Sequence, residues 1–550
     1  MRILIAHGYL LKGTGSNQYV QSLARAFCGQ GHHLLVTCQD DDPDLDFVSV
    51  FMADEAGLAA PRVVWEKETD YPGSCMVVKP DIGGLLPVYV MDSYEGFRVK
   101  EFTDLTDDEL HTYVELNRGS HTRLVEQFVP DAILANHAVM LPAILRPVAE
   151  AAEVPYFVCT HGSAIDFTVR RDDRYLHYGA LGLAGARAVF VPSEHSREQV
   201  LEVFADRTTA LDEKLVLVSP GVDTELFDLA KREFDEAVGL MGEEVSARTA
   251  SVRVGDFLGR GEDGEAGGGS GASDFARDIT WINGLHPEWL PEPDVTERLG
   301  ELAESERPFV MFLGKLLETK GVQCILPALP LVMRGHPDLA LVVVGFGEQR
   351  GMLQLMLQAL ADGDLLRLKR LSEYGNREYD RVDGAFEPVL SFLEGLSDAG
   401  EMDEYIRSCR EGGLVDAVTF TGYLTQEEHR HILPYAKALL VPSLAPEAFG
   451  LVATEAMACG VVPVASLHSG LRTALEPLEG IWGDDLDELR LEDGEGIVRR
   501  IASAVSAVLD MPADLLASRG REMRSVVRER FSWDAVAARM TDSFDEAAAD

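Results

Sequence analysis

Residues 436–471 read AKALLVPSLAPEAFGLVATEAMACGVVPVASLHSGL, and their pattern indicates a strand, a loop, a helix and a second strand. The apolar run 439–441 suits a strand that is buried on both faces of a parallel sheet. A helix of small and apolar residues is predicted over 449–459, with Gly460 at the position of a C-terminal cap. The second strand is predicted over 461–465. This arrangement is typical of an open α/β sheet.

Two glutamates fall at informative places in this stretch. Glu447 lies in the loop after the first strand, and Glu455 lies inside the predicted helix, whose first N–H groups belong to Phe449, Gly450 and Leu451. Free N–H groups at a helix start bind hydroxyl or phosphate oxygens, and carboxylates accept hydrogen bonds from sugar hydroxyls. Spacing alone would fit two surface glutamates, since the chain has 92 acidic residues. The position at a strand end favours a site for a polyol phosphate.

The composition sets limits on the class of protein. With 550 residues, two to four domains are expected. The formal net charge of -43 argues against a nucleic-acid partner and against adhesion to an anionic bilayer through a basic patch.

Targeting and redox features point to a cytoplasmic location. The chain starts MRILIAHG, which has no charged-then-apolar leader, and no apolar run approaches the length of a transmembrane helix. The seven cysteines are scattered without a CxxC pair, so neither a zinc site nor a disulfide framework is indicated.

The first residues predict a second βα array. A strand over 2–6 precedes a loop that contains Gly8, Gly13 and Gly15, and a helix is predicted over 17–28. The glycines let the backbone approach a ligand, although a tight turn without a ligand fits equally well. The patterns GxGxxG and GxxxxGK[ST] are both absent, so a dinucleotide fingerprint and a P-loop are not indicated.

The rest of the first half alternates between irregular and regular segments. Residues 40–109 predict loops and short strands that cap one domain, and the acidic run 40–42 predicts a solvated face. A helix is predicted over 110–128, and strands over 132–135, 156–160 and 188–191. The second of these strands ends at His161, beside Gly162. This histidine is a candidate site residue, with a hydrogen-bonded structural histidine as the equal alternative.

Beyond residue 225 the sequence predicts a linker and a second βα series. Residues 261–272, GEDGEAGGGSGA, predict a disordered or flexible insertion. The series begins at FVMFLGKLLETKG, residues 309–321, in which Lys315 and Lys320 flank a loop that could neutralise a diphosphate. The predicted organisation is a Rossmann-like domain, a linker, a second Rossmann-like domain with a helical insertion, and a final helix, over residues 1–225, 226–305, 306–525 (insertion 361–414) and 526–550.

Several of these blocks together resemble one family. PEAFGLVATEAMACGVVPVAS is similar to the E-x7-E signature of retaining glycosyltransferases of family 4, which have the GT-B fold. THG at 160–162, PGVDTELF at 220–227, GKLLETKG at 314–321 and VVVGFGE at 342–348 follow in the family's order. The resemblance implies two Rossmann-like domains that face a cleft.

The resemblance also implies roles for the candidate residues. Glu455 would hold the ribose of a nucleotide sugar, and Glu447 would face the sugar near the reacting centre. Lys320 and Lys315 would hold the diphosphate, although the family usually has arginine at the position of Lys315, which gives a flat two-pronged grip. The N–H groups of Phe449, Gly450 and Leu451 would contact sugar hydroxyls.

In the first domain, the resemblance implies that the Gly15 loop closes over the donor. Ser16 and Asn17 beside it would reach the acceptor, which could be a sugar, a polyol or a lipid-linked group. His161 would contact the sugar and, with Glu447, form the catalytic pair. No metal and no cofactor are expected beyond the nucleotide-sugar co-substrate.

Three functions remain open at this point. The first is a transferase that moves a sugar from a nucleotide donor with retained anomeric configuration. The second is a phosphorylase or synthase of the same fold that acts on a disaccharide or polysaccharide, and a hydrolysing epimerase fits the order of the blocks less well. The third is a nucleotide-sugar binding protein without turnover.

Overall fold

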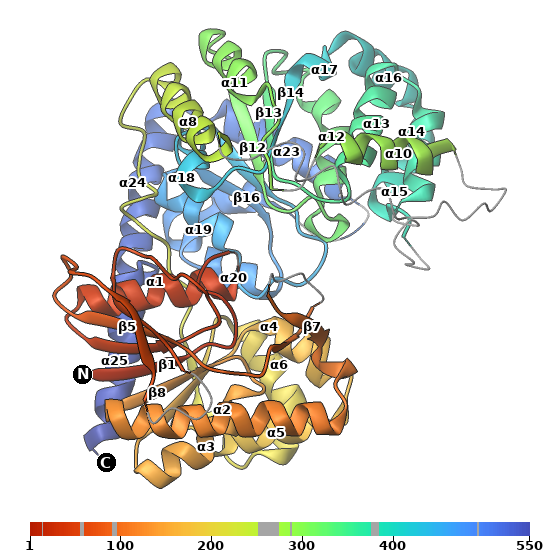
Figure 1. Ribbon diagram of the computed structural model, residues 1–550. Helices are drawn as coiled ribbons and strands as arrows, with labels where there is room; N and C mark the ends of the chain where they lie inside the picture. Colours follow the sequence, from red (N-terminus) through yellow and green to blue (C-terminus); the bar gives the residue numbers. More distant parts are fainter. Residues whose placement is uncertain are drawn as a thin grey trace. The chain divides into compact units, whose positions relative to one another are not determined.

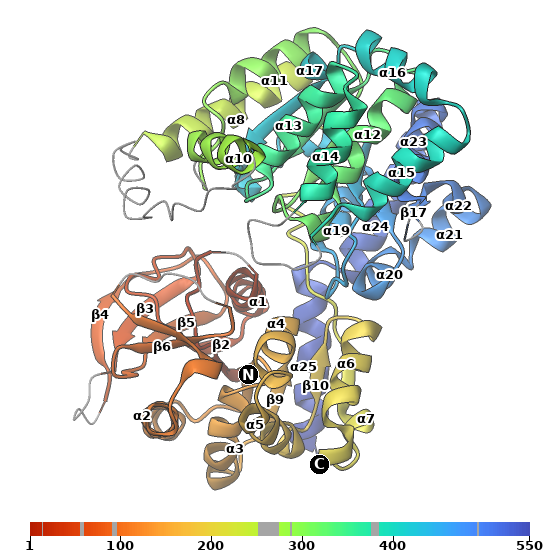
Figure 2. The same ribbon diagram turned by 90° about the vertical axis from the view of Figure 1, so that its right-hand side faces the viewer.

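The computed structural model describes residues 1–13, 15–54, 60–90, 96–250, 274–286, 289–375, 384–491, 494 and 496–549. It divides the chain into two compact units (Figures 1 and 2). Unit 1 comprises Met1–Asp223 and Glu529–Asp550, and unit 2 comprises Thr224–Arg528. The chain therefore leaves unit 1 once and returns to it at its end.

Unit 1 is built on a nine-stranded sheet with the order β11-β10-β9-β8-β1-β2-β5-β3-β4. All neighbouring strands are parallel except β4, which pairs antiparallel with β3. The strands are β1 Arg2–Ala6, β2 His33–Thr37, β3 Val48–Ala53, β4 Arg62–Glu66, β5 Ser74–Lys79, β8 Ala132–Asn136, β9 Tyr156–Cys159, β10 Val189–Val191 and β11 Leu215–Leu217, beside a separate parallel pair, β6 Leu85–Val88 and β7 Arg98–Glu101.

Alternation along the strands divides unit 1 into two cores. Leu4 and Ala6 of β1 belong to the core that the long helix α2 covers, while Ile3 and Ile5 face the core that α1 covers. The helices are α1 Ser16–Gly29, α2 Asp107–Phe128, α3 Leu141–Ala152, α4 Gly162–Ala164, η2 Ile165–Val169, α5 Asp173–Gly185, α6 Glu194–Phe204, α7 Leu211–Lys214 and α25 Trp533–Ala549, with short turns η1 Phe102–Asp104 and η3 Ala205–Arg207.

The last helix completes the second core of unit 1. Met540 and Phe544 of α25 are fully buried, and the Phe544 ring lies 4.6 Å from that of Phe157 and 6.1 Å from that of Phe27, centroid to centroid. The sequence predicted residues 526–550 as a separate terminal helix. In the structure, α25 supplies one layer of the first domain.

The segment 40–109 differs from its prediction. It contributes β3, β4 and β5 to the main sheet, whereas the sequence predicted only loops and short strands that cap a domain. The acidic run is also not a solvated face throughout. Asp40 is 7% exposed and accepts a hydrogen bond from the backbone N–H of Leu11 at 2.5 Å. A buried carboxylate here anchors the glycine-containing loop after β1.

Unit 2 contains a six-stranded parallel sheet with the order β14-β13-β12-β15-β16-β17. The strands are β12 Phe309–Leu313, β13 Ala340–Val344, β14 Val418–Gly422, β15 Ala438–Val441, β16 Val462–Ser466 and β17 Arg490–Leu491. Most of their residues are buried, as expected for a parallel sheet that helices cover on both faces. The strand order changes direction between β12 and β15, which places a switch point there.

Helices surround this sheet on both sides (Figure 2). They are α8 Phe234–Thr249, α10 Asp274–Leu285, α11 Val295–Glu304, α12 Val322–Val332, α13 Arg350–Ala361, α14 Leu365–Tyr374, α15 Glu387–Asp398, α16 Met402–Glu411, α17 Leu414–Ala417, α18 Gln426–His429, α19 Leu451–Ala458, α20 Ser469–Leu475, α21 Leu478–Trp482, α22 Leu486–Leu489, α23 Ile497–Asp510 and α24 Ala513–Arg530, with short turns η4 Glu318–Lys320, η6 Leu433–Tyr435 and η7 Gly483–Asp485.

The predicted linker and the predicted helical insertion both carry helices of unit 2. The predicted linker 226–305 carries α8, α10 and α11, which belong to unit 2. The predicted insertion 361–414 is helical in its described part, through α14, α15 and α16. The insertion predicted over 261–272 lies outside the described residues.

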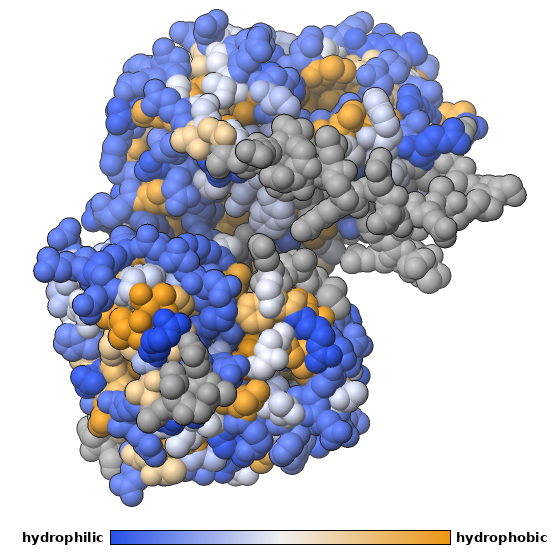
Figure 3. All heavy atoms as spheres, in the orientation of Figure 1, coloured by the Kyte–Doolittle hydropathy of each residue, from blue (hydrophilic) through white to orange (hydrophobic). Residues whose placement is uncertain are grey.

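The described surface is mainly hydrophilic on the face drawn in Figure 3, in keeping with the high content of charged residues. Within the described residues, no single helix has the length and apolar character needed to cross a membrane. The bent pair α23 and α24 passes the same test of length and composition when taken together.

Candidate functional site

The loop between β15 and α19 is held against the turn η4. Gly321 follows η4 with φ 72°, and a Cβ at this position would lie 1.9 Å from the carbonyl oxygen of Pro442, at the end of β15. Only glycine permits this close approach. As a result, Lys320 Nζ lies 2.5 Å from Glu447 Oε1, in a partly buried ion pair.

A closed ring of hydrogen bonds fixes Glu447. Ser443 Oγ donates to Glu447 Oε1 at 2.6 Å, and the Glu447 N–H donates to Ser469 Oγ at 2.8 Å. His468 closes the ring, with Nδ1 3.0 Å from Ser469 Oγ and Nε2 2.8 Å from the carbonyl oxygen of Ser443. Because that carbonyl oxygen can only accept, His468 Nε2–H donates to it, and Nδ1 accepts a hydrogen bond from the Ser469 hydroxyl. Hydrogen bonds to the carboxylate and to the backbone N–H of Glu447 therefore fix the orientation of this side chain.

The start of α19 is shaped by glycine. Gly450 precedes the helix with φ 110°, and a Cβ there would lie 2.4 Å from Leu471 Cδ2 in α20. No side chain caps this helix, while Phe449 is 3% exposed and Leu451 is 38% exposed. The predicted N–H groups therefore lie at a helix start that directly follows the Glu447 loop.

Glu455 lies on α19 and is buried. It is 5% exposed, and Gln426 of α18 donates to its Oε1 at 2.7 Å. Burial raises the pKa of Glu455 to about 8, while the Gln426 hydrogen bond opposes this shift. A carboxyl group with this pKa is largely protonated near neutral pH, so it can both donate to and accept from a ligand's hydroxyls.

Lys315 is exposed and follows β12 in a loop that interlocks with the loop after β13. A Cβ on Gly345 would lie 1.9 Å from the carbonyl oxygen of Gly314, so the two loops touch through their backbones. Lys315 Nζ lies 5.9 Å from the centroid of the Phe346 ring, a cation–π arrangement. Lys315 and Lys320 thus occupy different surroundings, and only Lys320 contacts Glu447.

An aromatic cluster lies beside Lys315 and was missed from the sequence. The Phe346 ring lies 4.4 Å from Trp289 and 5.3 Å from Tyr423, and Trp289 is 41% exposed. These residues follow three separate segments, so no local pattern reveals them. The contacts of Ser443, Ser469 and Gln426 were missed for the same reason, although Ser443 and Ser469 lie in the stretch 436–471.

In unit 1, the candidate residues Gly15, Ser16 and Asn17 lie at the start of α1, and Asn17 makes hydrogen bonds within the preceding loop. Gly15 precedes α1 with φ 63° and Ser16 begins the helix. Asn17 is 9% exposed, and its side chain donates to the carbonyl oxygen of Lys12 at 3.1 Å and lies 3.0 Å from His7 Nε2. Asn17 therefore shapes the loop, and its contact with an acceptor stays a prediction.

His161 lies at the end of β9 among other rings. Its centroid is 4.6 Å from that of His137 and 5.1 Å from that of Tyr19. Burial, with His7 as a smaller cause, lowers the pKa of His161 to about 3, and burial lowers the pKa of His7 to about 4. Both imidazoles are neutral at physiological pH, which limits them to hydrogen bonding rather than charge.

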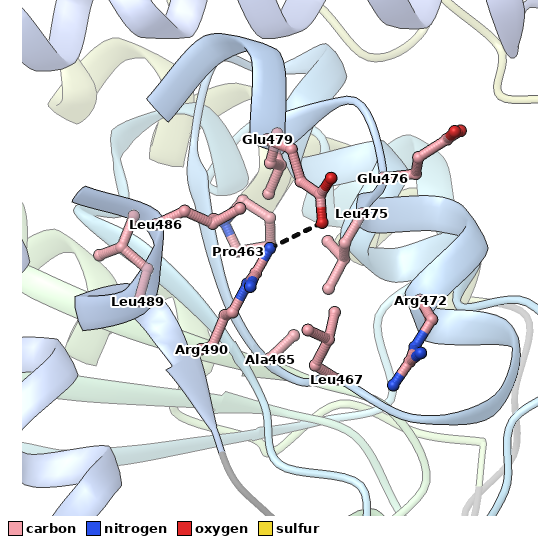
Figure 4. Close-up of a pocket in the computed structure, with 11 residues that line it drawn as sticks. Pro463, Ala465, Leu467, Arg472, Leu475, Glu476, Glu479, Leu486, Leu489 and Arg490 are labelled. Atoms are coloured by element: carbon pink, nitrogen blue, oxygen red, sulfur yellow. Dashed lines mark hydrogen bonds and ion pairs between the residues drawn. The ribbon is translucent and has the colours of Figure 1, made fainter. Parts of the chain in front are cut away.

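A separate cavity of about 170 Å³ lies in unit 2 under α20, α21 and α22 (Figure 4). The side chains that line it are mainly apolar, with an ion pair between Arg490 and Glu479 at 2.9 Å. None of the predicted site residues lines this cavity. Its lining reaches α20, the helix whose first residue, Ser469, holds the Glu447 backbone.

Two family models match the chain in this order. A glycosyl transferase 4-like domain matches residues 14–211, which include Gly15 and His161, and a model of glycosyl transferases group 1 matches residues 393–493, which include Glu447 and Glu455. The chain is 24% identical over 255 residues to a phosphatidyl-myo-inositol mannosyltransferase of Propionibacterium freudenreichii, covering 46% of this chain and 47% of that protein.

A second relative is a D-inositol 3-phosphate glycosyltransferase of Thermobispora bispora. It is 35% identical over 137 residues, covering 25% of this chain and 29% of that protein. The matched stretches thus span less than half the length of these two curated relatives.

Solved structures share the fold over the whole chain. Sucrose-phosphate synthase of Thermosynechococcus elongatus matches with a TM-score of 0.51 and 18% identity, covering 100% of this chain and 99% of the other. The Anabaena protein HepE in complex with UDP and glucose matches with a TM-score of 0.52 and 13% identity, covering 99% and 100%. With two parallel sheets and both domain models in order, the chain belongs to the group 1 glycosyltransferases of family 4, which have the GT-B fold.

Proposed function

We propose that this protein is a retaining glycosyltransferase that takes a sugar from a nucleotide-sugar donor held by unit 2. The observation that carries the proposal is the β15–α19 segment, which carries an oriented carboxylate and a buried carboxyl, together with the ammonium group of Lys320 that turn η4 brings to Glu447. Its position beside the switch point of the sheet is where open α/β sheets bind ligands.

Each group has a role that suits its surroundings. Lys320 would bind the donor's diphosphate and stabilise the negative charge that develops on it as it leaves. Glu447 would accept hydrogen bonds from the transferred sugar, and Glu455 would bind the ribose hydroxyls. Lys315 would add charge near the diphosphate, and the exposed ring of Trp289, which packs against Phe346, offers a face on which a base could stack.

The ion pair between Lys320 and Glu447 balances the charge of the two groups within the site. Without a donor, the ammonium group neutralises the carboxylate. When a diphosphate binds, Lys320 shares its donors between phosphate and carboxylate, which draws the sugar end of the donor toward Glu447. The acceptor's oxygen would then bond to the anomeric carbon on the face from which the diphosphate departs, as the diphosphate takes the bonding electron pair and the acceptor's proton.

Binding and transfer are tested together on one set of variants. UDP-, GDP- and ADP-sugars are titrated by calorimetry against the parent, Glu455→Gln, Glu447→Gln and the control Glu479→Gln, whose carboxylate pairs with Arg490 away from the site. We expect one donor series to bind the parent and the control equally. Glu455→Gln should weaken binding up to roughly 10-fold, because the amide keeps one donor and one acceptor and a neutral hydrogen bond is worth about 0.5–1.5 kcal/mol.

Glu447→Gln should act mainly on the rate. We expect radiolabelled sugar transfer to a pool of sugar, polyol and lipid-linked acceptors to fall at least 10-fold in kcat, with donor affinity changed less. Binding of a donor without transfer or hydrolysis would identify a binding protein. Sugar release from a disaccharide and inorganic phosphate, with no binding of nucleotide sugars, would identify a phosphorylase.

A further inference from the structure

Asn136 is a buried amide at the end of β8 that the proposed chemistry leaves without a role. It is 0% exposed. Its Nδ2 donates to the carbonyl oxygen of Ala6 in β1 at 3.2 Å, and its Oδ1 lies 3.1 Å from His161 Nε2 at the end of β9. One side chain therefore joins three neighbouring strands at the edge where His161 lies.

These two contacts determine the tautomer of His161. A carbonyl oxygen can only accept, so the Asn136 amide group must present its NH₂ to Ala6 and its oxygen to His161. The oxygen also can only accept, which requires His161 Nε2 to carry the proton. In a neutral imidazole, Nδ1 then has a lone pair.

We propose that Asn136 is a positioning residue that holds His161 as the Nε2–H tautomer, so that Nδ1 accepts a hydrogen bond from a hydroxyl group of the substrate. The inference rests on the proposed transfer of a sugar. It also narrows the chemistry of that contact, because a lone pair on a neutral ring attracts an O–H donor and repels a carboxylate or phosphate oxygen in the same place.

The surroundings of His161 keep its ring neutral. His7 from the end of β1, His137 from the end of β8 and Tyr19 from α1 face it, and none of them brings a negative charge at neutral pH. Burial lowers the pKa of His137 and raises that of Tyr19. Asp166, further along the chain, lies 3.6 Å from the guanidinium of Arg170. The tautomer is therefore set by Asn136, not by a nearby carboxylate.

The first test reads the tautomer directly, without activity. In protein labelled with ¹⁵N-histidine, the ring spectrum distinguishes the two tautomers, and His161→Gln identifies the signals. We expect Nε2–H for His161, unchanged from pH 8 to pH 5. A predominant Nδ1–H form, or a ring that becomes protonated above pH 5, would overturn the inference. The measurement needs only the parent protein and one variant for assignment.

The second test asks whether the lone pair serves the substrate. Saturating donor or acceptor should move the Nδ1 signal of the parent upfield, as expected when a lone pair accepts a hydrogen bond. Asn136→Leu should mix the tautomers and lower kcat/KM roughly 2-fold to 10-fold, the effect of losing one neutral hydrogen bond. The matched control is Asn117→Leu, which removes another buried amide of unit 1 whose Nδ2 donates to the carbonyl oxygen of Tyr113.

The outcomes separate the inference from the proposed function. If the Nε2–H tautomer is found but no donor and acceptor are ever joined, sugar transfer fails while the role of Asn136 in setting the tautomer stands. If transfer occurs, but substrate leaves the Nδ1 signal unmoved or Asn136→Leu acts no more than Asn117→Leu, the inference is wrong and the proposed function stands. Should Asn136→Leu not fold, the substrate-induced shift in the parent still decides.

Discussion

Glu455 shows how the surroundings of a single residue change its chemistry. The spacing of the two glutamates is visible in the sequence, but the difference between them is not. Glu447 receives a proton donor from Ser443 and an ammonium group from Lys320, whereas Glu455 receives one amide from Gln426. Burial without a cation raises the pKa of Glu455 to about 8.

This raised pKa predicts a pH dependence of stability. An acid whose folded pKa lies above its unfolded value of 4.5 binds more protons when folded, so its contribution is present below pH 4.5 and declines as pH rises toward 8. Glu455→Gln removes the titration. In the absence of ligand, the variant should therefore gain stability relative to the parent by up to about 1.4 kcal/mol per pH unit across this window.

Urea denaturation at pH 5, 6, 7 and 8 measures this difference, with Glu479→Gln as the control that should show no trend. Parallel pH curves for the parent and Glu455→Gln would contradict the prediction. Glu455→Gln should bind the donor more weakly than the parent and yet unfold less readily at pH 8. The two measurements therefore separate the role of Glu455 in binding from its effect on stability.

At the scale of elements, turn η4 and the end of β15 depend on a backbone contact. The sequence predicted the strands around both segments within a residue or two, because buried parallel strands form continuous apolar runs. It could not predict that Gly321 touches Pro442, because the two are distant in the chain. The ring of Ser443, Ser469 and His468 escaped prediction for the same reason.

Two glycines with the same φ allow the effect of this contact to be measured separately. Gly321 and Gly400 both have φ 72°, but a Cβ on Gly321 would lie 1.9 Å from the Pro442 oxygen, whereas a Cβ on Gly400 would meet nothing within 4 Å. Gly400→Ala should cost about 1 kcal/mol of stability for the left-handed conformation alone. Gly321→Ala should cost clearly more and displace Lys320.

Donor affinity and thermal stability of the two variants check this expectation. We expect Gly321→Ala to weaken donor binding at least 10-fold, the effect of about 1.4 kcal/mol, with Gly400→Ala close to the parent. Equal donor affinity in the two variants would mean that the contact between η4 and β15 does not set the position of Lys320.

At the scale of the whole molecule, the sequence predicted the two βα arrays. It did not predict that the C-terminal helix packs on the first of them. Alternating βα signals predicted both sheets. The place of β3, β4 and β5 in the first sheet was missed, because Val63 and Val64 of β4 are both exposed and give no alternating pattern. The C-terminal helix was predicted as a helix, but the rings that it packs against, Phe27, Phe157 and Phe190, are more than 350 residues away in the sequence.

A substitution at Phe544 tests how much the packing of α25 stabilises unit 1. Its side chain is 0% exposed, and it packs against Phe27, Phe157 and Phe190. Phe544→Ala should destabilise unit 1 by about 3–5 kcal/mol, the usual cost of deleting a buried aromatic ring. The control is Asp542→Ala on the exposed side of the same helix. Hydrogen exchange, followed separately in the peptides of each unit, should show faster exchange in β1 and β9 and little change in β12 and β13.

Helix α25 is the last element to be synthesised, and this affects the folding of unit 1 on the ribosome. The nine strands of the first sheet emerge early, but the helix that covers one of their faces is made only after all of unit 2. At 5–20 residues per second, roughly 300 intervening residues take about 15–60 s. During that interval the part of this apolar face that α25 covers is exposed, although α1 already covers the rest, so we expect the nascent chain to bind a chaperone.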